Sequence, residues 1–199
     1  MAGSTPRVGV LALQGAFREH VASLERLGAE AFEVRTPAEL EGVDGIVLPG
    51  GESTTMDLLL GSSGLREPLA QAIAAGIPVF GTCAGLILLA RDIEDGIEGQ
   101  RSFAALDVTA LRNGYGRQVK SFEGPVELAA GGVPMTGLFI RAPRITRVGD
   151  GVEVLARLGD EPVAVRSGSI MAATFHPELT DDDRLHGTFL EGIKNTSGG

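Results

Sequence analysis

Hydrophobic residues in the first half of the chain alternate between short continuous runs and longer segments with helical spacing. An apolar run of strand length covers residues 7–13, a Gln-Gly pair ends it, and an amphipathic segment follows over residues 16–27. This order predicts a strand, a tight turn and a helix. Two more short apolar runs, at residues 31–34 and 45–48, predict further strands.

The same alternation continues into the middle of the chain. Two helices and the next strand are expected at residues 55–60, 65–75 and 76–80. Pro49-Gly50-Gly51 forms the turn before the first of these helices, and Ser53 or Thr54 is expected to cap it. Strands that alternate with amphipathic helices predict a doubly wound, mostly parallel sheet with ligands beyond the carboxyl ends of its strands.

From Phe103 onward, strand-like runs are separated by Gly and Pro, which predicts additional antiparallel strands. These runs cover residues 104–111, 118–128, 137–140, 152–156, 163–166 and 170–175. A last helix is expected over residues 182–194, with acidic residues at its start to complement the helix dipole. We therefore expect one α/β domain over residues 1–199, with residues 196–199 as a frayed tail.

Composition narrows the class of protein. Of the 199 residues, 43% are hydrophobic and 22% are charged, which is enough for a substantial core. The 26 acidic against 17 basic residues give a net charge of −9, a poor match to nucleic acid or an anionic membrane. One cysteine excludes an internal disulfide, and the sequence shows neither a leader nor a long apolar span. We expect a cytoplasmic protein.

The single cysteine, Cys83, follows a short apolar strand in the pattern Gly-x-Cys-x-Gly, between Gly81 and Gly85. This pattern resembles a nucleophile elbow, in which small neighbours relieve a strained turn and the start of a helix favours the thiolate. The next amide, that of Ala84, would face an oxyanion. Most lone cysteines are small buried hydrophobes, so the pattern alone is weak.

A second signal lies near the carboxyl end, in Thr-Phe-His-Pro-Glu-Leu after an apolar run. In an extended segment residues two apart point the same way, so Glu178 can accept from one nitrogen of His176 while the other nitrogen faces a thiol. Pro177 restricts the backbone between them. A surface histidine and a helix-leading acid are the alternative, but together with Cys83 the pair predicts a nucleophile, a base and its orienting carboxylate.

The third signal is Leu-Pro-Gly-Gly-Glu-Ser-Thr-Thr-Met at residues 48–56. Gly50 and Gly51 let the backbone come close to a ligand, and the Gly51 amide is a candidate to complete an oxyanion hole with that of Ala84. A plain turn with a Ser or Thr cap explains the same residues. Its position at the same edge of the sheet favours a functional role.

Taken together, the Pro-Gly-Gly loop, the Gly-Thr-Cys-Ala-Gly elbow and His-Pro-Glu resemble the class I, triad-type glutamine amidotransferases. The motifs at residues 8–20, 48–56, 112–118, 139–143 and 175–180 resemble one branch of them, the glutaminase subunits of pyridoxal 5′-phosphate synthase. The resemblance runs from about residue 8 to residue 190, nearly the whole chain.

The resemblance implies hydrolysis of L-glutamine to glutamate and ammonia, and transfer of the ammonia to a separate synthase subunit in a hetero-oligomer. Cys83 corresponds to the nucleophile, His176 to the general base and acid, and Glu178 to the orienting carboxylate. Glutamine contacts carry over to Gly51, Glu52, Ser53, Arg112, Ile140 and Arg141. It implies no metal and no organic cofactor, and the scattered histidines with one cysteine show no metal spacing.

Several alternatives remain at the level of sequence. Most arginines in such an acidic chain form surface ion pairs, so Arg112 and Arg141 stand out only through the resemblance. We expect His20 and His186 to be exposed or half-packed residues without a catalytic role. The rival functions are another amidotransferase glutaminase, such as that of histidine or purine biosynthesis, a related Cys-elbow hydrolase or chaperone-like protein, and a non-enzymatic binding protein. The first helix and Gln14 are a candidate partner surface.

Overall fold

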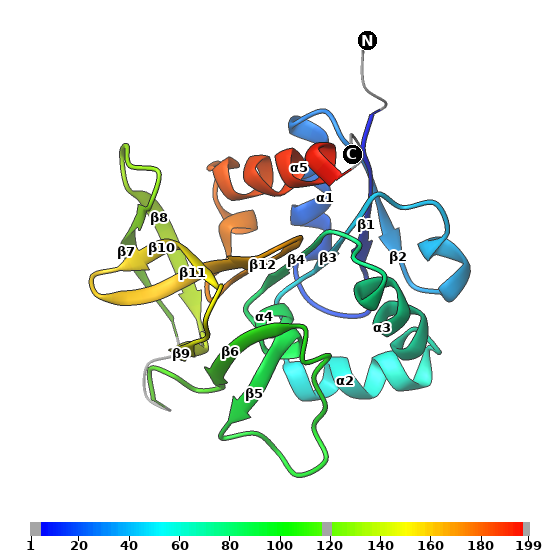
Figure 1. The fold of residues 1–199 in the computed structure, drawn as a ribbon, viewed down its shortest axis with the longest axis horizontal. Coiled ribbons are helices and arrows are strands. Elements are labelled where there is room, and N and C mark those ends of the chain that lie inside the picture. Colours follow the sequence, from blue (N-terminus) through cyan, green and yellow to red (C-terminus); the bar gives the residue numbers. More distant parts are fainter. Residues whose placement is uncertain (1–4, 117–120, 197–199) are drawn as a thin grey trace.

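Helices and strands alternate through the first half of the chain, and strands dominate the second half (Figure 1). The structure, a computed structural model, describes residues 5–116 and 121–196. Its helices are α1 (Phe17–Arg26), α2 (Ser53–Ser62), α3 (Arg66–Ala74), α4 (Ala84–Leu89) and α5 (Arg184–Thr196), with 3-10 helices η1 (Pro37–Leu40) and η2 (Pro177–Leu179). Its strands are β1 (Arg7–Leu11), β2 (Glu30–Val34), β3 (Gly45–Leu48), β4 (Val79–Thr82), β5 (Ala90–Glu94), β6 (Leu106–Leu111), β7 (Ser121–Leu128), β8 (Met135–Ile140), β9 (Arg144–Val148), β10 (Glu153–Leu158), β11 (Glu161–Ser167) and β12 (Ile170–Ala173).

A nine-stranded sheet organises the molecule, in the order β2-β1-β3-β4-β12-β11-β10-β7-β8. Strands β2, β1, β3, β4 and β12 run parallel to one another. Strands β11, β10, β7 and β8 extend the sheet with antiparallel pairs. This arrangement confirms the predicted α/β class with additional antiparallel strands. The carboxyl ends of β1, β3, β4 and β12 lie at one edge, which is where an open parallel sheet binds ligands.

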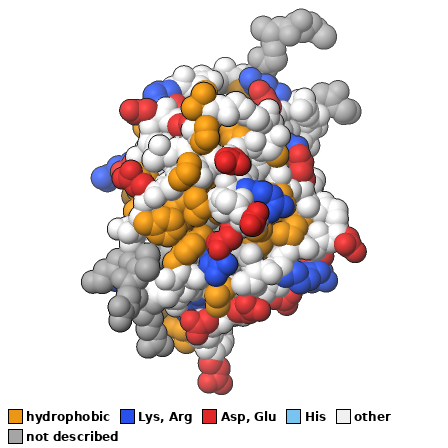
Figure 2. Space-filling view, turned by 90° about the vertical axis from the view of Figure 1, so that its left-hand side faces the viewer, with side chains coloured by type: hydrophobic (Ala, Val, Ile, Leu, Met, Phe, Trp, Pro, Cys, Tyr) orange, Lys and Arg blue, Asp and Glu red, His pale blue; other side chains and the backbone are white. Residues whose placement is uncertain are grey.

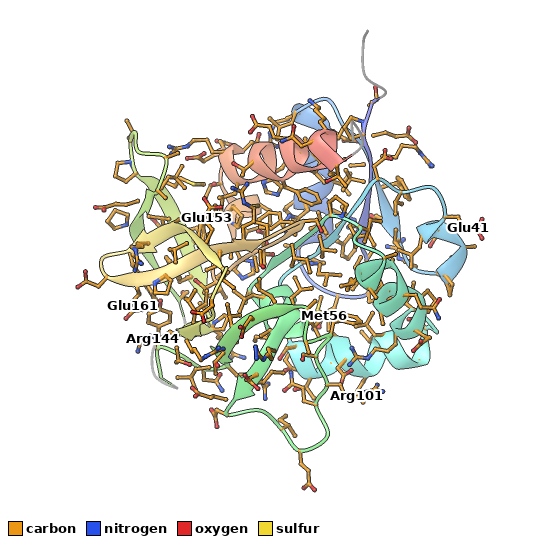
Figure 3. All side chains as sticks on the ribbon, viewed as in Figure 1. Glu41, Met56, Arg101, Arg144, Glu153 and Glu161 are labelled. Carbon is orange, nitrogen blue, oxygen red and sulfur yellow. The ribbon has the colours of Figure 1, made fainter. Side chains whose placement is uncertain are left out.

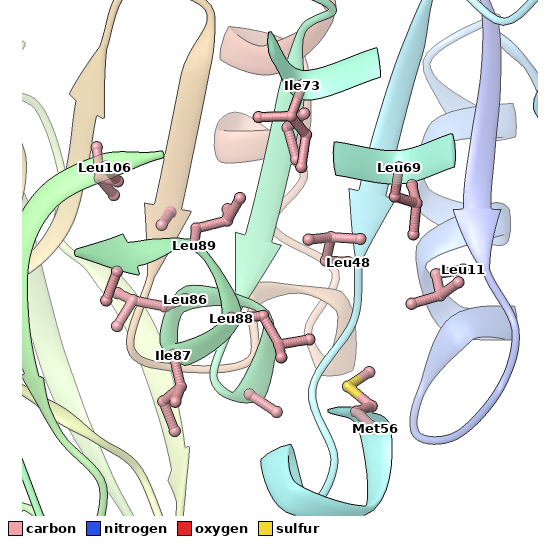
Figure 4. Packing of buried hydrophobic residues seen from close by; sticks show 14 of the residues in the cluster. Leu11, Leu48, Met56, Leu69, Ile73, Leu86, Ile87, Leu88, Leu89 and Leu106 are labelled. Carbon is pink, nitrogen blue, oxygen red and sulfur yellow. The ribbon is translucent and has the colours of Figure 1, made fainter. Parts of the chain in front are cut away.

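The parallel strands are buried on both faces because successive side chains alternate. In β3, Ile46 and Leu48 join the cluster under α2, α3 and α4, whereas Val47 joins the cluster under α1 and α5. Figure 4 shows the first cluster, where Leu48 lies among side chains of the helices, Met56 and Leu69 included. The two apolar clusters hold helices on either face and fix the sheet between them (Figure 1).

A second sheet of three strands, β5-β6-β9, was only partly predicted. The sequence pattern indicated β6 but neither β5 nor β9. In β5 the chain reads Ala-Arg-Asp-Ile-Glu with mostly exposed side chains, so no apolar run marks it. An ion pair of 2.6 Å between Arg144 and Glu161 connects β9 to β11 (Figure 3).

The ends of two elements differ from expectation. Neither Ser53 nor Thr54 caps α2; the cap is Glu52, whose side chain accepts hydrogen bonds from the amides of Thr54 and Thr55. Helix α5 begins two residues later than predicted and includes Thr196, the first residue of the expected frayed tail. Residues 117–120 and 197–199, which include part of an expected strand and the rest of that tail, lie outside the described residues.

Figure 2 looks onto the outer strands of the large sheet, where hydrophobic side chains gather in the middle of the face among acidic and basic ones. Val133, in the loop before β8, is 78% exposed. None of the helices in the described part of the chain has the length and apolar character needed to cross a membrane.

Candidate active site

Cys83 lies in the sharp turn between β4 and α4, and its backbone is strained. Its φ of 50° and ψ of −101° lie outside the regions that residues with a side chain prefer. The glycines around it are needed for space: a Cβ on Gly81 would lie 2.7 Å from a backbone atom of Gly85, and a Cβ on Gly85 would lie 2.0 Å from the Leu48 carbonyl oxygen. This is the geometry of a nucleophile elbow, with Ala84 opening the helix that follows.

His176 reaches the thiol from the neighbouring strand. Strand β12 pairs with β4, and the Cys83 amide donates a hydrogen bond of 2.8 Å to the Ala173 carbonyl. His176 interacts with Cys83 closely enough for the thiol to raise the pKa of the imidazole, and its Nδ1 lies 2.7 Å from Oε1 of Glu178. The imidazole therefore interacts with both the thiol and the carboxylate.

The route by which Glu178 meets His176 differs from the prediction. We expected an extended segment, but Pro177 opens the 3-10 helix η2, which turns Glu178 back towards the imidazole. Pro177 suits this role because its fixed φ is compatible with the first position of a helical turn. Both ends of the contact are enclosed: the His176 and Glu178 side chains are 8% and 0% exposed.

The surroundings of His176 favour its protonated form. Burial lowers the pKa of the imidazole, but its hydrogen bonds to Cys83 and Glu178 and the Glu178 charge outweigh burial and raise the pKa to about 10. Burial also opposes the charge of Glu178, yet interactions with His20 and His176 keep the pKa of Glu178 below its usual value. The geometry suits a pair of imidazolium and thiolate backed by a carboxylate.

The loop after β3 packs directly on the triad. A Cβ on Gly50 would lie 2.2 Å from Cε1 of His176, so only glycine allows this approach. Gly51 has a φ of 154°, and the Glu52 amide after it donates to Oε1 of Gln14 at 3.3 Å. On the other side, a Cβ on Gly15 would lie 1.6 Å from the Gly50 carbonyl oxygen. The turn after β1 therefore supports this loop, a contact that the sequence did not reveal.

Glu52 and Arg112 form an ion pair beside the loop. Oε1 of Glu52 lies 2.9 Å from Nη2 of Arg112, whose side chain is 14% exposed. Burial opposes the Glu52 charge, but hydrogen bonds from the Thr55 hydroxyl and from the Thr54 and Thr55 amides lower its pKa to about 2. The pair presents one carboxylate and one guanidinium at the edge of the site.

The other predicted binding residues lie at different depths. Ser53 is buried, and its hydroxyl accepts a hydrogen bond of 2.9 Å from Gln100, so the side chain faces the protein. The Ile140 carbonyl oxygen lies 3.9 Å from Sγ of Cys83. Arg141 follows in an exposed turn with a φ of 44°. Of these three, Ile140 approaches Cys83 through its backbone.

Two histidines contradict our expectation of exposed or half-packed residues. His20 and His186 are both fully buried, and His20 Nδ1 lies 2.9 Å from His186 Nε2. The spacing could have revealed this, because His186 is in phase with Phe189 and Ile193 on the buried face of α5. His20 Nε2 also lies 3.5 Å from Oε2 of Glu178.

No group of three or more His, Cys, Asp or Glu side chains able to hold a metal occurs in residues 5–116 and 121–196.

Comparison with known proteins gives consistent matches over the whole chain. A 54% identical relative from Parafrankia sp. (strain EAN1pec) and a 53% identical relative from Frankia alni are both named pyridoxal 5′-phosphate synthase subunit PdxT. The alignment with the first protein covers 98% of this chain and 97% of that protein. The alignment with the second covers 98% of this chain and 99% of that protein.

Comparison with solved structures also gives matches over nearly the whole chain. A crystal structure of a glutamine amidotransferase, 50% identical, superposes with a TM-score of 0.87 and covers 94% of this chain and 98% of its own. A putative GMP synthase subunit from Thermoplasma acidophilum, 16% identical, shares the fold with a TM-score of 0.69, over 98% of this chain and 97% of its own. The model of the SNO glutamine amidotransferase family matches residues 10–195. The chain belongs to the SNO glutamine amidotransferase family.

Proposed function

We propose that this chain hydrolyses L-glutamine to L-glutamate and ammonia and delivers the ammonia to a synthase subunit that makes pyridoxal 5′-phosphate. The observation that carries the proposal is that His176 interacts with Cys83 and is hydrogen-bonded to Glu178 at the carboxyl edge of the sheet. The family match and the names of the PdxT relatives support the substrate and the partner. The enzyme works in the cytoplasm, where its single free thiol stays reduced.

In the proposed reaction the Cys83 thiolate attacks the side-chain carboxamide carbon of glutamine. The amides of Gly51 and Ala84 are the proposed donors to the resulting oxyanion. His176 then gives its proton to the departing nitrogen, the C–N bond breaks, and ammonia leaves a glutamyl thioester. His176 next takes a proton from water, the water oxygen attacks the thioester, and glutamate is released with the thiolate restored.

Binding of glutamine requires groups for its ammonium and carboxylate as well as for its side chain. Glu52 and Arg112 lie 2.9 Å apart and offer charges complementary to those two groups. Ser53 would contribute its backbone, because its hydroxyl is occupied by Gln100. Ile140, whose carbonyl oxygen lies 3.9 Å from the thiol sulfur, and Arg141 after it complete the proposed binding residues.

Covalent trapping tests the substrate assignment. A glutamine-like electrophile should label Cys83 in the wild-type protein, Cys83→Ala should remain unlabelled, and excess glutamine should protect the thiol. Mass spectrometry of the labelled peptide provides the measurement. Labelling at the same rate with and without glutamine would remove glutamine as the substrate. A non-enzymatic binding protein instead predicts that Cys83→Ala retains full function.

The partner assignment has a separate test. Because the Gly50-Gly51 loop carries a proposed oxyanion donor and lies on His176, we expect low glutaminase activity from the isolated chain and stimulation by the synthase subunit. Ammonia release at one glutamine concentration, with and without that subunit, measures the effect. Equal rates would contradict control by the partner while leaving the hydrolysis itself intact.

A further inference from the structure

A group of polar side chains is buried directly behind the triad, where three elements meet. His20 on α1 and His186 on α5 are 0% exposed, as is Thr82 at the end of β4. His20 Nδ1 lies 2.9 Å from His186 Nε2, and His20 Nε2 lies 3.1 Å from Oγ1 of Thr82. The ring of Phe80 packs edge-on against both imidazoles, with centroids 6.2 Å and 5.5 Å away. Buried polar groups of this kind require partners.

The group reaches the triad through Glu178. Oε1 of this carboxylate is 2.7 Å from His176 Nδ1, but Oε2 is buried and has no hydrogen-bond partner among the described residues. His20 Nε2 lies 3.5 Å from Oε2 and is the nitrogen that faces it. An unpaired anionic oxygen in a closed site is costly, so a donor at this position has a large effect on the carboxylate.

Of the two neutral arrangements of protons, one fits the chain of contacts better. If His20 carries its proton on Nε2, that N–H lies within 3.1 Å of Thr82 Oγ1 and 3.5 Å of Oε2 of Glu178, while Nδ1 accepts from Nε2–H of His186. The Nδ1 atom of His186, which has no partner among the described residues, is then a bare lone pair. The opposite tautomers would bury an unpaired N–H on His186 and turn a lone pair of His20 towards the carboxylate.

Both imidazoles are neutral in this arrangement. Burial lowers the pKa of His20 and lowers that of His186 to about 3. The charged or titratable groups that act on the two rings are Glu178, His176, Glu19, Asp183 and Arg26. Neutral His20 therefore acts as a hydrogen-bond donor that adds no charge to the site.

We infer that His20 is a positioning residue for the triad: its Nε2–H holds the second oxygen of Glu178, and His186 fixes the tautomer in which His20 can do so. This inference rests on the proposed glutaminase function. With both oxygens held, Glu178 keeps one orientation towards His176, and His176 keeps its ring aligned with Cys83. None of the triad residues comes from the segment at residues 14–20. Its last residue, His20, thereby gains the role of positioning Glu178.

The test uses three variants assayed with the synthase subunit present. His20→Leu removes the donor, and His20→Gln retains an N–H near the position of Nε2. Leu24→Ala creates a cavity on the same buried face of α1, one turn from His20, and removes no polar atom. We expect His20→Leu to lower kcat about tenfold with KM unchanged, since hydrogen bonds to charged groups are the strong ones.

The pH profile separates positioning from packing. With Glu178 less well held, the imidazolium and thiolate pair is less stable, so the acid limb of kcat/KM should move to higher pH in His20→Leu. His20→Gln should restore most of kcat and the position of that limb, whereas Leu24→Ala should lower Tm and leave the limb in place. Wild-type kcat and an unmoved limb in His20→Leu, or losses that follow Tm in all three variants, would overturn the inference.

Nuclear magnetic resonance gives a readout that needs no activity. Nitrogen shifts of the wild-type imidazoles should show His20 protonated on Nε2, and the low-field Nδ1–H proton of His176 should shift in His20→Leu but not in His20→Gln. A His20 protonated on Nδ1 would overturn the inference, even if His20→Leu fails to fold. Absence of wild-type glutaminase activity would instead contradict the proposed function, and these resonances would still decide the role of His20.

Discussion

Glu52 shows how one side chain serves two parts of the site. Its carboxylate accepts hydrogen bonds from the amides of Thr54 and Thr55, which caps α2, and Oε1 also pairs with Arg112. A capping carboxylate interacts favourably with the positive end of the helix dipole. The position of α2 and the position of the Arg112 guanidinium therefore both depend on the charge of Glu52.

Replacing Glu52 by glutamine should affect stability and substrate binding together. The neutral amide is a weaker acceptor for the helix amides, so we expect Glu52→Gln to lower the free energy of unfolding by about 1 kcal/mol. The loss of the Arg112 partner should raise KM for glutamine several-fold, with a smaller change in kcat. Urea unfolding and steady-state kinetics measure the two effects.

Glu39 offers a matched control for Glu52. Its Oε2 atom accepts from the amides of Arg35 and Thr36 at the start of η1, with no contact to the site. Glu39→Gln should therefore lower stability and leave KM unchanged. If both variants change KM equally, the effect at Glu52 is not due to its place beside Arg112.

Sequence predicted some residues of the site far better than others. Cys83 and His176 were singled out because an elbow pattern and a short motif mark them, and their catalytic roles stay a prediction. The α2 cap was misassigned because Ser and Thr are the usual caps, whereas here the longer Glu52 side chain reaches two amides. His20 was missed because its role depends on contacts with α5 and η2, which are distant in sequence.

At the scale of elements, the elbow depends on close contact between α4 and β3. A methyl group at Gly85 would lie 2.0 Å from the Leu48 carbonyl oxygen, a backbone atom that cannot move without the strand. We expect Gly85→Ala to lower the free energy of unfolding by about 3 kcal/mol, as overpacking does, and to abolish activity by displacing Cys83. Thermal unfolding and thiol labelling measure the two effects.

Gly192 on α5 is the corresponding control, since a Cβ there would meet nothing within 4 Å. In an open helical position alanine is favoured over glycine, so Gly192→Ala should raise stability by about 0.5–1 kcal/mol with unchanged activity. A loss of stability in both variants would mean that the contact with Leu48 is not the cause.

The sequence predicted a strand wherever the strand is buried and its residues form a continuous apolar run. Strands β1, β3 and β4 consist mostly of apolar residues, and their pattern was sufficient. Strand β5 was missed because its side chains are mostly exposed and it forms by pairing with β6. Its conformation comes from the tertiary contact rather than from its own sequence.

At the scale of the whole molecule, the two histidines behind the triad couple folding to pH. His20 and His186 have lowered pKa values in the folded state, so below pH 6.5 the unfolded chain binds protons that the folded chain does not. Stability should therefore decrease as the pH falls below 6.5.

The acid side of this profile gives the sharpest prediction. From pH 6.5 to pH 5, His186 alone, with a pKa of about 3, should lower the free energy of unfolding by about 2 kcal/mol, and His20 acts in the same direction. Few carboxylates titrate in this interval, so the histidines dominate it. Urea unfolding at several pH values measures the slope, and His186→Gln should reduce it because glutamine binds no proton. An equal slope in both proteins, or a flat wild-type profile over this range, would show that His186 is not buried in its neutral form.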